Sequence, residues 1–223
     1  MGHITPVSIA TGKSLYGAIA VTAGSLKLNE TGTLASTVTM SGGTLQVDDD
    51  TTIDSSSRIS LLSSSILKIV TGKTLAYSGS AISVGASTLT LRGGVCFVSG
   101  GLTLNDADSK LLLNSITLDS VSTSSDSLGL DVDNNSTITA LSVGHITPVS
   151  IAAGKSLSGA VTVTAGSLKL NETGTLASTI AMSGGTLDSD ESSTVSGALS
   201  HTADIEIDVA TSKTLTYSGA AIS

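Results

Sequence analysis

Acidic side chains recur at one place in the repeats of this chain, after short apolar segments, and could bind calcium. Carboxylate oxygens are preferred Ca²⁺ ligands. In stacked β coils, carboxylates at the same position of neighbouring coils lie about 5 Å apart. Asp131–Asn135 begins like a calcium loop, but Ser136 and Ser142 replace the required glycine and glutamate. The alternative is a solvated acidic edge. The candidate ligands of a structural ion are Glu30, Asp49, Asp50, Asp133, Glu172, Asp190 and Glu191.

Residues for catalysis are sparse. The three histidines include His3 and His145, which occupy the same repeat position, and no nucleophile motif, phosphate loop or metal-spaced His/Cys set occurs. Paired aspartates on a β-helix can cleave polysaccharides, but the chain lacks residues for an aromatic or basic groove. The lone cysteine, Cys96, is either a small residue near the core or a reactive thiol. We therefore predict no enzyme and no cofactor other than calcium.

A series of hydroxyl side chains recurs once per repeat unit. Stacked threonines suit an exposed strand position, whereas an ice-binding face would require a second, paired rank of threonines, which is incomplete here. We therefore expect an exposed outer ladder with no ice-binding role. Its members are Ser14, Thr33, Thr52, Thr74, Cys96, Thr117, Thr137, Ser156, Thr175, Thr194 and Thr214.

The elements that carry these residues repeat on two length scales. Residues 2–45 and 144–187 are identical at 38 of 44 positions, at an offset of 142. At one of the differing positions, Tyr16 of the first copy corresponds to Ser158 of the second copy. A change from tyrosine to serine is typical of a surface position, so Tyr16 should be exposed. The repeat resumes at residues 213–223, which match residues 73–83. This pattern suggests a fragment of a longer tandem array, forming one domain over residues 1–223.

A shorter period of 19–22 residues predicts an all-β fold: a parallel β-helix, or β-solenoid, of about eleven coils. Apolar pairs such as Val7/Ile9 and Leu26/Leu28 begin each unit, and we expect the series Val7, Leu26, Leu45 to stack. Each coil should contain three short strands, with a second inward residue such as Leu75 or Phe97. Serine-rich Ser55–Ser65 should form an insertion loop, and residues 105–143 fit the register least well. A β-sandwich is the alternative.

Composition narrows the classes of partner. The net charge of −8 disfavours nucleic-acid binding. Aromatic residues make up 2% of the chain, and no segment approaches the roughly 18 apolar residues of a membrane span. No secretion signal is visible at the start of the chain, but a fragment need not carry one.

The units, with motifs such as GSLKL, SGGTL and GKTL, resemble the repeats of filamentous-haemagglutinin-type adhesins and autotransporter passenger domains. The resemblance implies a right-handed coil, favoured over a left-handed one, and secretion to the bacterial surface or beyond. The expected role is a non-enzymatic rigid stalk or adhesin spacer that contacts other surface or matrix components. The alternative is a filament subunit that stacks end to end with itself. A ligand-binding adhesin would need a site in Ser55–Ser65 or 105–143.

Overall fold

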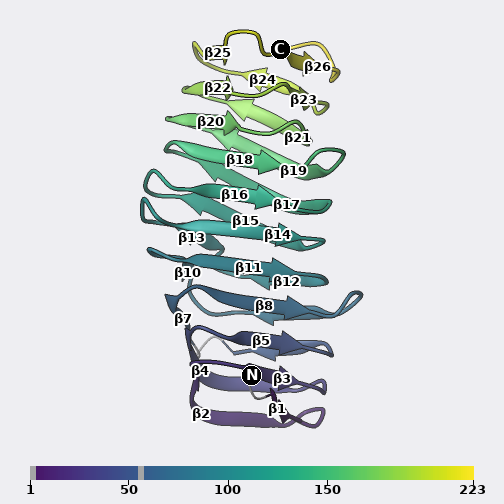
Figure 1. The fold of residues 1–223 in the computed structure, drawn as a ribbon. Helices are drawn as coiled ribbons and strands as arrows, with labels where there is room; N and C mark the ends of the chain where they lie inside the picture. Colours follow the sequence, from purple (N-terminus) through teal and green to yellow (C-terminus); the bar gives the residue numbers. More distant parts are fainter. Residues whose placement is uncertain (1–3, 55–57) are drawn as a thin grey trace.

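The computed structural model describes residues 4–54 and 58–223, which form a parallel β-solenoid (Figure 1). The chain winds from the purple N-terminal end to the yellow C-terminal end as a single stack. Each strand of the 11-stranded sheet pairs in parallel with its counterpart in the next coil. The described residues contain 26 strands and no helix, so the predicted all-β solenoid is confirmed. His3 lies outside the described residues.

The 11-stranded sheet carries the first strand of each coil, and its alternating side chains point into the core and to solvent. Its strands are β1 (Ile4–Val7), β3 (Ser25–Leu28), β5 (Thr44–Val47), β8 (Ser65–Ile69), β11 (Thr88–Arg92), β14 (Lys110–Asn114), β16 (Gly129–Val132), β18 (Thr147–Ile151), β20 (Ser167–Leu170), β22 (Thr186–Ser189) and β25 (Glu206–Val209).

The 15-stranded sheet carries the rest of each coil. The second and third predicted strands are separate in some coils, but in others they form a single long strand, as in β2, β4 and β19. The strands are β2 (Ser14–Val21), β4 (Thr33–Ser41), β6 (Thr51–Ile53), β7 (Ile59–Ser63), β9 (Thr74–Tyr77), β10 (Ile82–Ser83), β12 (Val95–Val98), β13 (Leu102–Leu104), β15 (Thr117–Thr123), β17 (Ser136–Val143), β19 (Ser156–Val163), β21 (Thr175–Met182), β23 (Ser193–Val195), β24 (Leu199–His201) and β26 (Leu215–Tyr217).

The core is a continuous column of aliphatic side chains between the two sheets. Leu34, Leu45 and Leu111 are completely buried, and Tyr16 is 76% exposed, as its replacement by serine in the second copy predicted. The expected loop at Ser55–Ser65 is wrong in part, because β7 and the first residue of β8 lie within it. Ile59 of β7 is buried, which holds this segment on the core. Residues 55–57 of that stretch lie outside the described part.

Several predicted registers differ from the observed ones by two positions. Val7 pairs with Leu28, and not with Leu26. Leu67 pairs with Leu91, while Ser65 takes the position opposite Leu89. A shift of two preserves which side chains face inward, so the apolar alternation does not report it. Buried hydroxyls fill the extra inward positions: Ser65 donates to the carbonyl of Ser63 at 2.9 Å.

The predicted facing of Phe97 is wrong. Cys96 is buried, whereas Phe97 is 49% exposed and Val98 is buried. The sequence period placed Phe97 opposite Leu75, but the residue that pairs with Leu75 is Cys96. A shift of one position exchanges the two faces of a strand. Cys96 is therefore a core residue and no member of the outer hydroxyl ladder.

Candidate functional site

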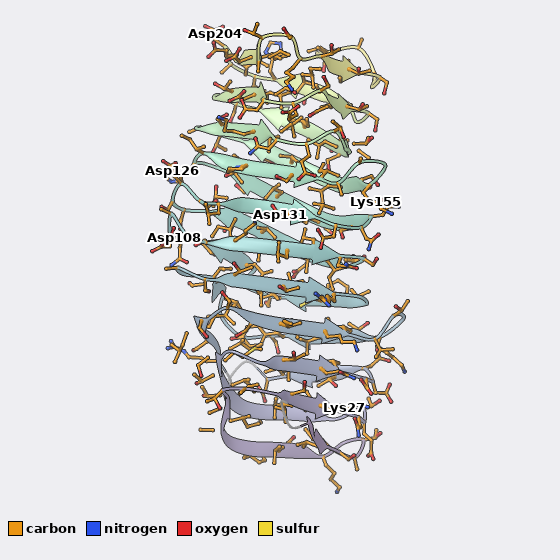
Figure 2. All side chains as sticks on the ribbon, viewed as in Figure 1. Lys27, Asp108, Asp126, Asp131, Lys155 and Asp204 are labelled. Atoms are coloured by element: carbon orange, nitrogen blue, oxygen red, sulfur yellow. The ribbon has the colours of Figure 1, made fainter. Side chains whose placement is uncertain are left out.

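Most lysines of the 11-stranded sheet form ion pairs with carboxylates of the neighbouring coil. The distance from Nζ to the carboxylate oxygen is 2.6 Å for Lys27–Asp48 and for Lys110–Asp131. Figure 2 labels Lys27 and Asp131 over this sheet. Lys169 bonds Asp188 at 3.1 Å and Asp190 at 3.3 Å. Because these side chains lie on adjacent parallel strands or directly after one, each pair connects two coils on the outer surface.

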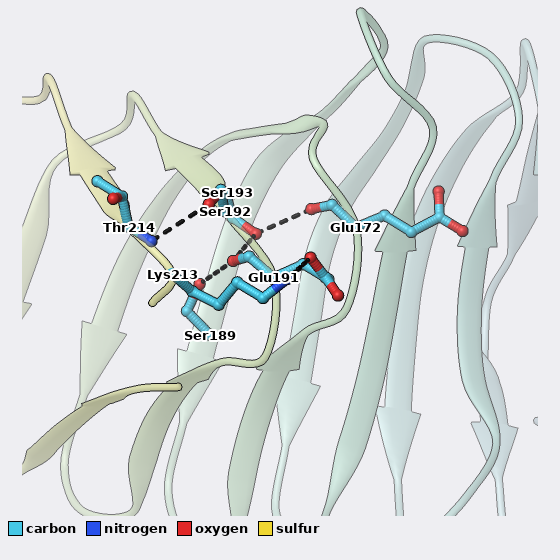
Figure 3. A network of polar contacts seen from close by, with 7 residues as sticks. All are labelled: Glu172, Ser189, Glu191, Ser192, Ser193, Lys213 and Thr214. Carbon is cyan, nitrogen blue, oxygen red and sulfur yellow. Dashed lines mark hydrogen bonds and ion pairs between the residues drawn. The ribbon is translucent and has the colours of Figure 1, made fainter. Parts of the chain in front are cut away.

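Two further ion pairs lie at the corner after this sheet and are equivalent in the two repeats. Lys73 bonds Asp49 at 2.6 Å, and Lys213 bonds Glu191 at 2.5 Å. Figure 3 shows the second corner, where the Ser193 hydroxyl also donates to the carbonyls of Glu172 and Glu191. We call the paired residues the lysine–carboxylate ladder: Lys27, Asp48, Asp49, Lys73, Lys110, Asp131, Lys169, Asp188, Asp190, Glu191 and Lys213.

Hydrogen bonds of the ladder shift the pKa of four residues: Asp48, Asp49, Lys73 and Lys169. The hydrogen bond from Lys73 lowers the pKa of Asp49, and the same bond raises the pKa of Lys73. Burial alone would raise the pKa of Asp48, but hydrogen bonds from Lys27 and Gln46 outweigh it, so the pKa is lowered. Since all these groups are partly solvated, the pairs fix orientation and register more than they add stability.

The structure distributes the seven predicted calcium ligands over several environments. Asp49, Asp190 and Glu191 bond lysines, and a carboxylate oxygen of Asp50 accepts from the Thr74 N–H at 2.8 Å. Glu30, Asp133 and Glu172 have exposed side chains. In residues 4–54 and 58–223, no three His, Cys, Asp or Glu side chains gather where they could hold a metal ion. Calcium binding stays a prediction, and lysine is the partner that the structure shows for Asp49, Asp190 and Glu191.

Sequence reasoning missed the lysines. The signal was present, because Lys27 precedes Asp48 by about the length of one coil, and Lys110 precedes Asp131 by the same step. Elsewhere the spacing differs: the step from Lys169 to Asp188 is shorter, and at the corner the carboxylate Asp49 comes before its lysine, Lys73. The pairs could therefore be recognised only once the length of each coil was known from the structure.

The predicted hydroxyl ladder exists only in segments. Thr33 stacks between Ser14 and Thr52, but Thr52 then pairs with Ala76, and Thr74 pairs with Val95. Burial raises the pKa of the Cys96 thiol to about 12. Thiolate formation is therefore suppressed, which agrees with a core cysteine and not with a reactive one.

Among the described residues, no helix has the length and apolar character to cross a membrane. Comparison of the chain with protein families, curated proteins and solved structures gave no match.

Proposed function

We propose that this chain is a structural repeat module that acts as a rigid spacer, in a bacterial surface or extracellular protein of the adhesin type. The observation that supports the proposal is the uninterrupted parallel pairing of the 11-stranded sheet from β1 to β25. Consecutive coils share this sheet, the aliphatic core and the lysine–carboxylate ladder. A solenoid of this kind keeps a fixed direction over its length, because each coil is held by its two neighbours.

The near-identity of residues 2–45 and 144–187 supports the same role. A duplicated segment stacks on its copy through interfaces that already exist, so length can increase without new contacts. The ion pairs Lys73–Asp49 and Lys213–Glu191, at equivalent corners, are an example of an interface kept in both copies. The proposed location outside the cell is based on the resemblance of the repeats to those of secreted adhesins.

Inserting one further long period into the chain tests the spacer role. One period corresponds to seven strands of the 11-stranded sheet, from β1 to β16, with β18 as the first strand of the next copy, or about 34 Å of added length at the usual strand spacing. The maximum dimension from X-ray scattering should increase by that amount with an unchanged cross-section. A glycine–serine insert of equal length is the control. A period that adds no length, or a rod that bends as freely as the control, would contradict a rigid spacer.

The location needs a separate measurement on the native host. Antibodies against this chain should label intact cells, and external protease should remove the label. Labelling only after lysis would contradict a surface role but would leave the spacer geometry intact.

A further inference from the structure

The 15-stranded sheet contains an interruption between two adjacent coils. β7 pairs with β4 below it, and β10 pairs with β13 above it. Within the described residues, no backbone hydrogen bond joins β7 to β10. The first strands of the same two coils, β5 and β8, remain paired. The interruption is thus local to one side of the solenoid.

The long repeat contains an internal comparison for this position. Leu199 and His201 of β24 are the counterparts of Ile59 and Leu61, and Ser223 is the counterpart of Ser83, at an offset of 140. There the step is bonded: the His201 N–H donates to the Ser223 carbonyl at 2.8 Å, and the Ser223 N–H donates to the Leu199 carbonyl at 3.3 Å. The equivalent bonds between β7 and β10 are missing.

An open cavity of about 370 Å³ lies at the interruption. This volume is at the lower end of the range of about 300–1,000 Å³ for small-molecule sites. Its lining residues include three serines, Ser60, Ser80 and Ser83, and the cationic residue Arg58. We call this cavity, with Ile59, Leu61 and Ala81 as its remaining lining, the β7–β10 slot.

The slot contains a cation that no described carboxylate neutralises, as does the groove lined by Lys68 and Arg92 on the 11-stranded sheet. The net charge is −8, and the lysines of the lysine–carboxylate ladder are neutralised by carboxylates. No described residue forms an ion pair with Arg58, which is among the residues that line the slot. A guanidinium group matches the two oxygens of a carboxylate, and serine hydroxyls both donate and accept hydrogen bonds. A ligand that fits this set carries one carboxylate and several hydroxyl groups.

We propose that the β7–β10 slot binds a small polyhydroxy carboxylate, with Arg58 holding the carboxylate and the serines and free strand edges holding the hydroxyl groups. The ligand is either a free sugar acid or the acidic residue of a glycan, since both present this chemistry. An extended peptide strand is the less suitable occupant. β7 and β10 belong to adjacent coils, and an inserted strand would need about twice the normal spacing of about 4.8 Å.

Calorimetric titration of the full chain with D-gluconate tests the proposal. Sorbitol lacks only the carboxylate and butyrate lacks the hydroxyl groups, so both should bind at least tenfold more weakly than gluconate. Methyl β-D-glucuronide represents the glycan source, and its affinity relative to gluconate distinguishes the two sources. Absence of saturable binding by both acids would overturn the proposal.

Two variants with matched charge locate the binding site. Arg58→Gln should weaken gluconate binding about ten- to hundredfold, as expected for loss of a charge-assisted hydrogen bond. Arg92→Gln should leave binding unchanged, because Arg92 lines a different groove, on the 11-stranded sheet, together with Lys68. The opposite result would move the site to that groove and overturn the proposal.

A third variant tests the shape of the slot without changing charge. Ala81 is exposed and lines the cavity, so Ala81→Phe should fill the slot and abolish binding while the circular dichroism spectrum and the melting temperature stay unchanged. Unchanged binding in this folded variant would refute the slot. Displacement of gluconate by a short glycine–serine peptide that binds more tightly would instead indicate strand addition and overturn the proposal.

Discussion

Cys96 gives the most direct test of the observed register, because the predicted repeat period places it on the outer face and the structure places it in the core. The thiolate is the reactive form of cysteine. At pH 9.0, a thiol with a pKa of 9.0 is half ionised, whereas a pKa of about 12 leaves about one thiolate per thousand molecules. We therefore expect disulfide reagents to label native Cys96 at least about 500-fold more slowly than the urea-unfolded chain, before any steric protection.

A double variant supplies the matched control. Replacing Cys96 by alanine and Phe97 by cysteine moves the thiol one position along β12, to a site that is 49% exposed in the native protein. Its labelling rate at pH 9.0 should be close to that of the unfolded chain. Both rates are measured by the absorbance of the released thiol, with urea-treated samples as the reference.

The same pKa predicts how stability depends on pH. Because the folded-state pKa of Cys96 is raised, its contribution is complete below pH 9.0 and is lost as the pH rises toward 12. The difference in unfolding free energy between the native chain and Cys96→Ala should change by up to about 4 kcal/mol over that range. Fast labelling of native Cys96, together with protection of a cysteine at position 97, would refute the observed facing.

Leu34→Ala and Leu176→Ala, at equivalent buried positions of the two copies, should each lower the unfolding free energy by about 2–5 kcal/mol in urea titrations. Tyr16→Ser should stay within about 0.5 kcal/mol of the native chain, and a larger loss would mean that Tyr16 is packed. The lowered pKa of Asp49 means that its pair with Lys73 contributes fully above pH 3.8 and is lost as the pH falls further. Asp49→Asn should therefore flatten the melting temperature profile below pH 3.8. Millimolar calcium tests the predicted ion site: a rise in the melting temperature that chelators reverse would support it, and an unchanged melting temperature would favour the solvated acidic edge.

The apolar alternation predicted the fold because inward and outward positions of a strand have different physical requirements. Leu26, Leu28 and Leu45 are buried for that reason. It could not fix the register, since a shift of two positions leaves the facing unchanged. It also overlooked inward hydroxyls such as Ser65 and Thr147, which are polar by type but bond a nearby carbonyl. The error at Phe97 came from a coil that is one position shorter than the predicted period.

The candidate sites were harder to predict than the fold. The acidic corners were visible as residue types, but their partners depend on which residue of the next coil arrives beside them. Asp49, for example, meets Lys73 of the next coil, which comes 24 residues later in the chain. The β7–β10 slot had no signature in the sequence. It arises where two strands of ordinary sequence form no backbone hydrogen bonds with each other.

The parallel stacking also determines how the chain can acquire its structure. The Thr33 N–H bonds the carbonyl of Lys13 near the start of the chain, and the Thr194 N–H bonds the carbonyl of Gly174 near its end. Each of these bonds closes a loop of one coil. The entropy lost in closing such a loop depends on its length, so it is similar for the first coil and for the last. These bonds join each coil to the coil directly before it, so they need no residues that are synthesised much later. A nascent or translocating chain can therefore fold in sequence order as it emerges, and lengthening the array does not raise the barrier for any one step.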